Sequence, residues 1–479
     1  MESFYPDYFD SDTIEFETSK RKYVRLRIIL TASLLILITF FSALGFSVHS
    51  LVNPKDPMPL NTAQTELLED TLNQNYPSRT KIVTPLPYKT IPADLFINAE
   101  SAIIIDKDTG NILFEKNADM LIPPASMTKL VEMYVVFEAV ANGEVSLDDT
   151  VPLPKESWAV NLPSDASIMF LAQGQSVTLR ELLLGLAIAS GNDASIAVAK
   201  YICKDMESFV ERMNKVISDL GLKKTHFVES SGYSEKNITT AREFAAFCRK
   251  YIEKFPESIK DYHSQKVLRY PLEKNLPKEQ KDQGDSQAVI QYNTNKLLGL
   301  LDGCDGLKTG FIYESGYNIA LTSERNGRRF ISITMKGPGR GSVQGNKFRI
   351  QDGTTLMEFA FSRFAPYKGN GKERNYTIGC SGTEYRSIRL VPALDEKFSV
   401  PFIAGATPEE AASMIEVTAS IPPYINGEIQ CGQELGFLNY SLDGKTLRKI
   451  PLVADRENKK AGVLFRLWGN IVAKTASLL

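Results

Sequence analysis

The distribution of apolar and polar residues divides the chain into segments of different kinds. The first apolar run, residues 28–52, contains no acidic or basic residue and exceeds the roughly 20 residues that a helix needs to cross a bilayer. Residues 53–90 are rich in Pro, Thr, Gln and Asn, which predicts a tether. Helical patterns dominate residues 126–255, between a strand hairpin at 102–114 and further strands at 307–335. This order predicts an α+β fold, in which a helical subdomain is inserted into a sheet.

The pattern changes again towards the C-terminus. Short alternating runs follow Phe364 and predict a separate small β domain. In the last segment, residues 461–479, Arg466, Asn470 and Lys474 are spaced four apart and form one polar stripe. The other side of this segment carries Leu464, Leu467, Trp468, Ile471 and Leu478. We expect an amphipathic helix that lies in the plane of a membrane; the alternative is a helix docked on the β domain.

Charge adds an orientation to the N-terminal apolar run. Acidic and aromatic residues fill positions 2–17, and a basic cluster then directly precedes the run. That cluster consists of Lys20, Arg21, Lys22, Arg25 and Arg27. Because basic flanks stay in the cytoplasm, it predicts a single-pass anchor in the cytoplasmic membrane with the rest of the chain outside. A cleaved signal peptide is the alternative, although its leader would be long and Ala43-Leu44-Gly45 is only a passable cleavage site.

Composition excludes several classes of protein. The chain has 479 residues, enough for two domains with appendages. Its 55 basic and 57 acidic side chains nearly balance, so nothing in the overall charge points to nucleic acid. Five cysteines without close spacing do not indicate a disulfide framework. No cluster of His and Cys has metal-ligand spacing, and we expect neither a metal nor a cofactor.

Three short polar motifs interrupt the apolar pattern, and the first is Ser126-Met127-Thr128-Lys129. It lies between Pro123-Pro124 and an apolar stretch, residues 130–137, which predicts a buried helix starting at the motif. Ser126 and Lys129 would then be neighbours on one helical face. A serine hydroxyl needs an adjacent base, and a lysine can be that base when burial or a nearby cation lowers its pKa. Ser126 is therefore the candidate nucleophile and Lys129 the candidate base.

The other two motifs are Ser190-Gly191-Asn192 and Lys308-Thr309-Gly310. The former separates two helical runs and supplies a hydroxyl and a carboxamide, although a cap and turn would explain it as well. The latter lies in a strand-like stretch, where Lys308 and Thr309 suit a substrate carboxylate and Gly310 leaves room for another backbone. Each motif alone is a weak signal. Together, in this order, they indicate an active-serine acyl transferase.

With these motifs the chain resembles the D-alanyl-D-alanine carboxypeptidases among the low-molecular-mass penicillin-binding proteins. The resemblance covers roughly residues 99–458 and includes Thr225-His226-Phe227, Thr240-Ala241-Arg242 and Gly316-Tyr317-Asn318. It implies a β-lactamase-like antiparallel sheet with a helical subdomain, followed by a small all-β domain. It also implies a membrane-tethered hydrolase that removes the terminal D-alanine from peptidoglycan stem pentapeptides. β-Lactams would be its covalent inhibitors.

The resemblance implies catalytic and binding roles for the motif residues. Ser126 would form the acyl-enzyme, Lys129 would activate it, and Ser190 would pass a proton to the departing D-alanine. The substrate would be held by Asn192, Lys308, Thr309 and Gly310.

Two further positions follow from the same resemblance. Backbone N–H groups of Ser126 and Phe311 would form the oxyanion hole, although some family members carry histidine where this chain has Phe311. Arg349 falls where a family arginine approaches the substrate carboxylate, with Arg340 and Lys347 as close alternatives.

Pattern and resemblance together divide the chain into six parts. These are a cytoplasmic tail at 1–27, a transmembrane anchor at 28–52, an extracytoplasmic linker at 53–92, the catalytic domain at 93–365, the β domain at 366–456 and a membrane-associated helix at 459–479.

Several alternatives stay open at this point. A DD-endopeptidase or transpeptidase would share the acyl-enzyme. A β-lactamase would need a loop glutamate in an E-x-x-L-N stretch, but the nearest candidate, residues 273–277, has Pro277 in place of asparagine. A non-catalytic penicillin-binding scaffold would not need the whole polar set. A Ser-His-Asp triad through His226 is poorly supplied, since the chain has only two other histidines.

Overall fold

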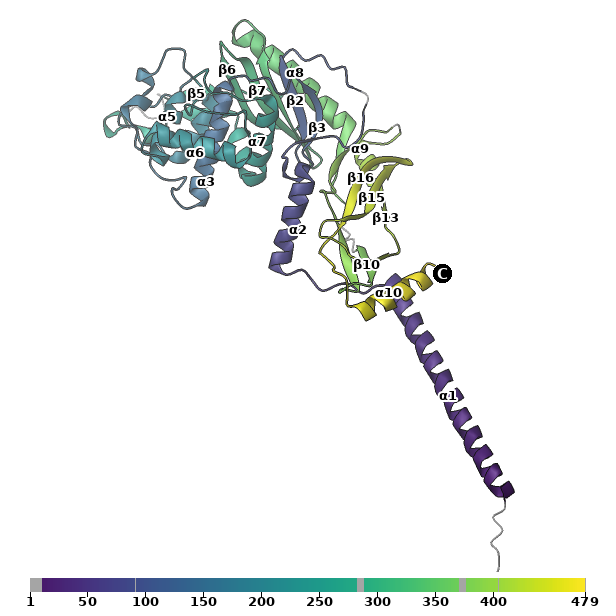
Figure 1. Cartoon of the computed structure of the whole chain (residues 1–479). Coiled ribbons are helices and arrows are strands. Elements are labelled where there is room, and N and C mark those ends of the chain that lie inside the picture. Colours follow the sequence, from purple (N-terminus) through teal and green to yellow (C-terminus); the bar gives the residue numbers. More distant parts are fainter. Residues whose placement is uncertain (1–10, 91, 282–287, 370–375, 404, 479) are drawn as a thin grey trace, which may run out of the picture.

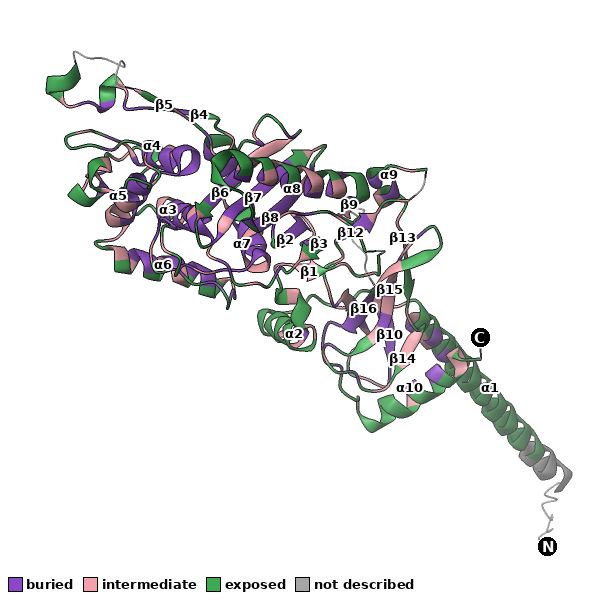
Figure 2. Cartoon of the chain, turned by 90° about the horizontal axis from the view of Figure 1, so that it is seen from above, coloured by how far each residue is buried: buried purple, intermediate pink, exposed green. Residues whose placement is uncertain are grey.

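The computed structural model describes residues 11–90, 92–281, 288–369, 376–403 and 405–478, with side chains from residue 19 onward. Helix α1, Ser11–Val52, leaves the rest of the molecule as a single rod (Figure 1). Its stretch Ser19–Val52 is apolar and long enough to span a membrane. Most of that stretch is solvent-exposed (Figure 2), as expected of a helix whose apolar surface is covered by lipid. The helix starts before the predicted anchor and includes its basic flank; residues 1–10 lie outside the described part.

The segment predicted as a tether differs from expectation, because much of it is folded. It contains α2, Thr62–Asn75, the short helix η1, Pro77–Thr80, and strand β1, Thr84–Pro85. Asn61 and Gln64 form a reciprocal capping box at the start of α2. Leu68 and Leu72 pack against Ala393 and Val453 of the β domain. The polar composition of the segment concealed this short apolar face.

The central sheet of the catalytic domain has six strands in the order β1-β3-β2-β8-β7-β6. All neighbouring strands are antiparallel except β1 and β3. This confirms the predicted antiparallel α+β sheet. The remaining strands are β2, Ser101–Asp106; β3, Asn111–Lys116; β6, Cys304–Ile312; β7, Gly316–Arg325; and β8, Arg328–Gly337.

Both faces of the sheet are covered, which explains why β2 is buried along its whole length. Ile103 and Ile105 contribute to the core beneath the helical subdomain, whereas Ala102 and Ile104 face the core under α8, Gly341–Arg363. Alternate side chains of a strand point to opposite faces, so the two sets belong to different cores. Edge strand β6 remains free to border the cleft described below.

The helical subdomain is inserted between β3 and β6, as the sequence predicts. It is continued by a hairpin of β4, Val267–Tyr270, and β5, Val289–Tyr292, around the short helix η7, Glu273–Asn275. The charged stretch at residues 273–287 has the composition of a flexible insertion, but its first residues form η7 with Asn275 buried; residues 282–287 lie outside the described part. The helices are η2, Ala125–Thr128; α3, Lys129–Ala141; η3, Lys155–Ser157; η4, Ala159–Asn161; α4, Leu179–Leu184; η5, Gly185–Ala189; α5, Asn192–Ile202; α6, Met206–Asp219; α7, Ala241–Lys254; and η6, Ile259–His263.

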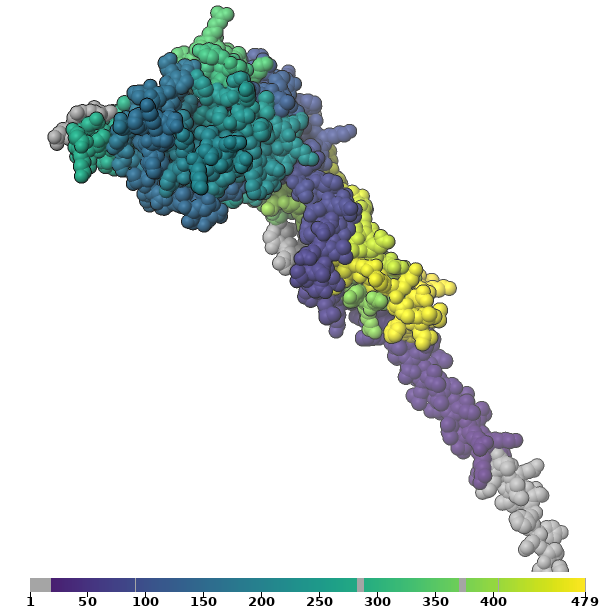
Figure 3. Space-filling view, turned by 60° about the vertical axis from the view of Figure 1, so that its left-hand side comes forward, coloured from purple at the N-terminus to yellow at the C-terminus, as the bar shows by residue number. Residues whose placement is uncertain are grey.

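The C-terminal part is a β domain, as predicted, with a six-stranded sheet in the order β13-β15-β16-β11-β10-β14. It lies between the catalytic domain and the N-terminal rod (Figure 3). Its elements are β9, Phe364–Tyr367; β10, Tyr376–Ser381; β11, Ser387–Pro392; β12, Phe398–Pro401; α9, Pro408–Ser413; β13, Glu416–Ser420; β14, Tyr424–Asn426; β15, Glu434–Leu442; and β16, Lys445–Ala454.

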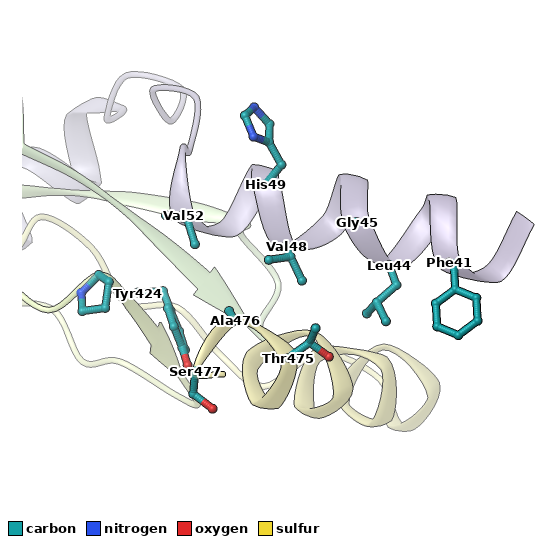
Figure 4. Close-up of a pocket in the computed structure, with 11 residues that line it drawn as sticks. Phe41, Leu44, Gly45, Val48, His49, Val52, Tyr424, Thr475, Ala476 and Ser477 are labelled. Carbon is teal, nitrogen blue, oxygen red and sulfur yellow. The ribbon is translucent and has the colours of Figure 1, made fainter. Parts of the chain in front are cut away.

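The last helix, α10, Val463–Ala476, crosses the C-terminal end of α1 (Figure 4). Val472 packs with Leu44, Val48 and Leu51 of α1. The indole N–H of Trp468 donates to the Ser47 hydroxyl at 3.3 Å. The helix also contacts strands β10 and β14 of the β domain. This is the docked position that the sequence left open as the alternative. Its outward side nevertheless exposes Val463, Leu464, Phe465, Leu467, Ile471 and Leu478.

The packing of α2 generates a stability prediction. Leu72 is 1% exposed, whereas Leu67 on the same helix is 55% exposed. Leu72→Ala should lower the free energy of unfolding by about 2–5 kcal/mol because it leaves a cavity, and Leu67→Ala should change it by less than about 0.5 kcal/mol. Chemical denaturation of the detergent-solubilised protein measures both. Equal stabilities of the two variants would show that α2 does not support the β domain.

Candidate active site

The first motif lies at the junction of η2 and α3, where the chain enters the core under the sheet. Ser126 is on the tight turn of η2, and the α-helix itself begins only at Lys129. The predicted spacing is nevertheless realised, since the Lys129 ammonium nitrogen lies 3.3 Å from the Ser126 hydroxyl. Ala125, immediately before the serine, has a left-handed backbone with φ of 51°. Such a conformation is costly for a residue with a side chain and is often found at functional sites.

Lys129 is completely buried and has hydrogen-bond partners for all three of its donors. Besides Ser126, it donates to the Asn192 side-chain oxygen at 2.7 Å and to the Ser231 carbonyl at 2.5 Å. Burial lowers the pKa of Lys129, while the negative charges of Glu132, Glu229 and Asp193 act in the opposite direction. A lysine with a lowered pKa can be neutral at moderate pH and can accept a proton.

The second motif follows the short π-turn η5. Ser190 has a left-handed backbone, with φ of 59°, and its hydroxyl accepts a hydrogen bond from Lys308 at 3.0 Å. Asn192 begins α5 and reaches Lys129, as described above. Asp193 follows and is buried; its carboxylate accepts backbone N–H bonds from Met169 and Leu171. These bonds fix the motif against the loop that forms one rim of the cleft.

The third motif is on β6, the edge strand of the sheet. Lys308 is 1% exposed, and burial followed by the charges of Lys129 and Arg349 keeps its pKa well below the usual value. The Thr309 hydroxyl donates to Thr294 at 2.7 Å. A Cβ atom added at Gly310 would lie 2.5 Å from the Pro124 carbonyl oxygen and 3.1 Å from the Ala125 Cβ. The close approach expected at Gly310 is therefore present, and it brings β6 against the turn that carries Ser126.

Arg349 reaches the same place from α8. Its guanidinium donates to the Gly310 carbonyl at 2.5 Å and to the Asn346 side chain at 3.0 Å, and it stacks on Tyr317 at 4.9 Å. Burial lowers the pKa of Arg349 to about 10, which still leaves it cationic at neutral pH. Phe311 packs against Tyr317 with ring centroids 4.4 Å apart. The structure thus places Arg349 beside the third motif.

These residues meet at a cleft of about 1090 Å³ between β6 and the helical subdomain. Nine of the predicted site residues lie in its lining or just behind its wall. Those that line it are Ser126, Ser190, Thr309, Gly310, Phe311 and Arg349. Lys129, Asn192 and Lys308 lie behind them and reach the lining through the hydrogen bonds described above.

The loop from Glu229 to Asn237 was missed by the sequence reasoning. Glu229 accepts hydrogen bonds from the backbone of Ser231 and Gly232 and from the Asn237 side chain. This fold of the loop presents the Ser231 carbonyl to Lys129. The small residues Ser230-Ser231-Gly232 signal a turn, but no pattern shows that a turn so distant in sequence holds Lys129.

The histidines do not supply a catalytic triad. His226 is exposed and forms an isolated β-bridge with Ile238. His263 is fully buried, where burial and the nearby charge of Lys308 lower its pKa to about 3. Its Nε2 atom is 2.7 Å from the Tyr251 hydroxyl. His263 is thus a core residue, although its sequence surroundings are polar.

Known proteins resemble this chain in both fold and sequence. The structure of penicillin binding protein 5 from Haemophilus influenzae matches with a TM-score of 0.63 and 27% identity, covering 78% of this chain and 100% of that one. The carboxypeptidase DacF of Bacillus subtilis is 30% identical over 379 residues, 78% of this chain and 89% of the relative. DacC of Escherichia coli is 28% identical over 385 residues, 79% of this chain and 88% of that relative.

The fold is that of the low-molecular-mass penicillin-binding proteins. The family model described as D-alanyl-D-alanine carboxypeptidase, Peptidase_S11, matches residues 88–339. The chain belongs to this family of serine peptidases.

The tight contact at Gly310 yields a prediction about the cleft. In Gly310→Ala the new methyl group would push β6 away from the Ser126 turn, so acylation by a fluorescent penicillin should slow by about 10²-fold. Gly462→Ala is the matched control, because a Cβ atom there meets nothing within 4 Å. Stopped-flow labelling measures both rates. An unchanged rate in Gly310→Ala would show that the contact does not position the serine.

Proposed function

We propose that this peptidase removes the terminal D-alanine from peptidoglycan stem pentapeptides through an acyl-enzyme on Ser126. The contact between Ser126 and the buried Lys129 is the observation that carries the proposal. Both long relatives reported above are named D-alanyl-D-alanine carboxypeptidases. The arrangement of the three motifs around one cleft supports the same reaction.

In the first step, the Ser126 oxygen attacks the carbonyl carbon of the penultimate D-alanine. The hydroxyl proton moves to neutral Lys129, and the carbonyl electron pair moves onto the oxygen, where the N–H groups of Ser126 and Phe311 stabilise it. The tetrahedral intermediate then expels D-alanine, whose nitrogen receives a proton. Ser190 lies between Lys308 and the cleft and is the group we assign to this transfer. Water completes the cycle by hydrolysing the ester.

Substrate binding follows from the charges at the far end of the cleft. Thr309 and Arg349 line it and are assigned to the terminal carboxylate of the substrate. Lys308 lies behind the wall and is assigned to the same carboxylate-binding end, which it reaches through its hydrogen bond to the Ser190 hydroxyl. Asn192 holds Lys129 and is assigned to a substrate amide. A β-lactam presents a carboxylate and a strained amide with comparable spacing, so the same groups would bind it as a covalent inhibitor.

The alternative reactions are less well supported. A D-alanyl-D-alanine endopeptidase of Pseudomonas aeruginosa is 30% identical, but over 162 residues, 33% of this chain and 49% of that relative. For a β-lactamase, the candidate Glu273 belongs to η7 and is not among the described residues that line the cleft. The intact set of buried, hydrogen-bonded polar groups argues against an idle scaffold, because burial of two lysines is costly without a function.

The anchoring of the protein is the second part of the proposal. We assign α1 to a single pass through the cytoplasmic membrane, with residues 1–27 in the cytoplasm. Since α10 crosses the outer end of α1, its exposed apolar side would lie at the outer membrane surface (Figure 4). The catalytic domain would then be held away from the lipid by the β domain, where it could reach peptidoglycan.

The catalytic assignment predicts the behaviour of two variants. Ser126→Ala should abolish both penicillin labelling and release of D-alanine from an acyl-D-Ala-D-Ala peptide. Lys129→Ala should slow acylation by about 10²–10⁴-fold, the usual contribution of a positioned base. Thr128 is unsuitable as a control, because its hydroxyl accepts a hydrogen bond from the Asn237 side chain at 3.3 Å. The exposed Ser218 on α6 serves instead, and Ser218→Ala should keep full activity. Mass spectrometry that located the adduct on any other residue would refute the mechanism.

The anchoring assignment predicts two modes of membrane attachment. The full-length protein should stay in the membrane fraction after alkaline carbonate washing. A protein that starts at residue 53 should still float with anionic vesicles, and Leu464→Glu combined with Phe465→Glu should abolish that flotation because both side chains are exposed on α10. Flotation that does not depend on these two residues would exclude α10 as a membrane contact.

A further inference from the structure

Helix α3 carries a second ionisable group one turn beyond the catalytic lysine. Glu132 is completely buried, as is Lys129. Neither carboxylate oxygen of Glu132 has a hydrogen-bond partner among the described residues. An unsatisfied buried carboxyl is among the most costly groups a protein interior can hold. Its position beside the reacting groups suggests that this cost serves the reaction.

The neighbouring donors are engaged elsewhere, which indicates that Glu132 acts on Lys129 through its charge and not through a direct hydrogen bond. The three donors of Lys129 are directed at Ser126, Asn192 and Ser231. The Ser195 hydroxyl of α5, which helps to lower the pKa of Glu132, is engaged with Ser230 at 2.7 Å. Among the described residues Glu132 therefore has at most this one shared donor, and its carboxyl can influence Lys129 through the electrostatic field inside a poorly solvated core.

The charges that face this pair come from every side of the core. Glu229 approaches from the 229–237 loop and raises the pKa of Glu132, and Asp193 on α5 raises that of Lys129. Lys308 on β6 is a further buried lysine, and the charge of Lys129 adds to burial in lowering the pKa of Lys308. Burial is the largest influence on both groups, raising the pKa of Glu132 and lowering that of Lys129. The positive charge of Lys129 acts against burial at Glu132 and favours its carboxylate form. Among the groups that oppose burial, Glu132 has the largest effect on the pKa of Lys129.

We propose that Glu132, one helical turn from Lys129 on α3, is a positioning residue that sets the base strength of Lys129 through its charge. The inference rests on the proposed role of Lys129 as the base. Without a negative charge nearby, a fully buried lysine would be too weak a base to take the serine proton efficiently. Glu132 restores part of that basicity from a distance.

The proton balance of the first step shows where this matters. As the bond between Ser126 and the carbonyl carbon forms, the hydroxyl proton goes to the Lys129 nitrogen and creates an ammonium group inside the core. The Glu132 carboxylate stabilises this ammonium and gives up no proton itself. When the proton later leaves with D-alanine, the pair returns to its starting state. Glu132 therefore contacts neither substrate nor reacting atoms.

The test is the pH profile of acylation by a fluorescent penicillin, measured on the full-length protein in detergent. Each rate is normalised to the amount of enzyme that can be acylated, so that misfolded molecules do not count. Glu132→Gln removes the charge and should lower the pKa of Lys129. Since neutral Lys129 is the active form, the acid limb of the profile should move to lower pH by about one unit, equivalent to a tenfold faster reaction on that limb. The plateau rate at higher pH should fall, because the base is weaker.

Three further variants define the result. Glu132→Met has similar length and no charge and should shift the limb in the same direction, which covers a failure of the glutamine variant to fold. Glu132→Asp keeps the charge and should leave the limb close to that of the natural protein. Glu138→Gln is the matched control on the same helix, because Glu138 is paired with Lys254 at the surface, and it should leave the profile unchanged.

The outcomes separate this inference from the proposed function. An acid limb that stays in place in both Glu132→Gln and Glu132→Met, while Lys129→Ala loses acylation, overturns the role of Glu132 alone. A uniform loss of rate at every pH also overturns it, because it indicates a merely structural residue. Acylation that persists in Lys129→Ala would instead overturn the assignment of the base itself.

Discussion

The complete burial of Lys129 is the constraint on which the catalytic domain depends. An amine in a protein core requires acceptors for its hydrogen bonds, and here they come from three separate segments: the η2 turn, the start of α5 and the 229–237 loop. Two residues in or next to these segments have a left-handed backbone conformation: Ala125 in η2 and Ser190 just before α5. The helical subdomain can thus be understood as the scaffold that collects three acceptors around one lysine and leaves a serine hydroxyl at the cleft.

The sheet contributes the opposite wall by a contact that only glycine permits. Gly310 lets β6 approach the carbonyl of Pro124, and this approach places Lys308 behind Ser190. Because β2 and β8 are packed on both faces, β6 is held at the edge of a rigid sheet. A rigid edge and a rigid helix start leave little freedom at the reacting atoms, which is the condition under which positioned groups accelerate a reaction most.

The β domain connects this site to the anchor more firmly than a flexible linker would. Leu68 and Leu72 of α2 pack on it from one side, and α1 and α10 meet it at its far end. Between the two domains, the Asp106 carboxylate accepts a hydrogen bond from the Ser399 hydroxyl, and burial raises its pKa to about 6. The molecule is therefore an elongated series of packed parts (Figure 3), so the distance of the cleft from helix α1 is set by folded structure.

The sequence by itself determined the local chemistry: the apolar anchor, the three motifs, the hairpin at 102–114 and the alternating pattern of the β domain. These depend on residues that are near one another in the chain, where period and spacing carry the information. Tertiary structure alone decided what lies far apart in sequence. The Ser231 carbonyl on Lys129, the guanidinium of Arg349 on Gly310 and the docking of α2 are contacts between distant segments. Glu132 shows the same limit, since its position on an apolar helix gives no sign that it is buried without a partner beside the catalytic lysine.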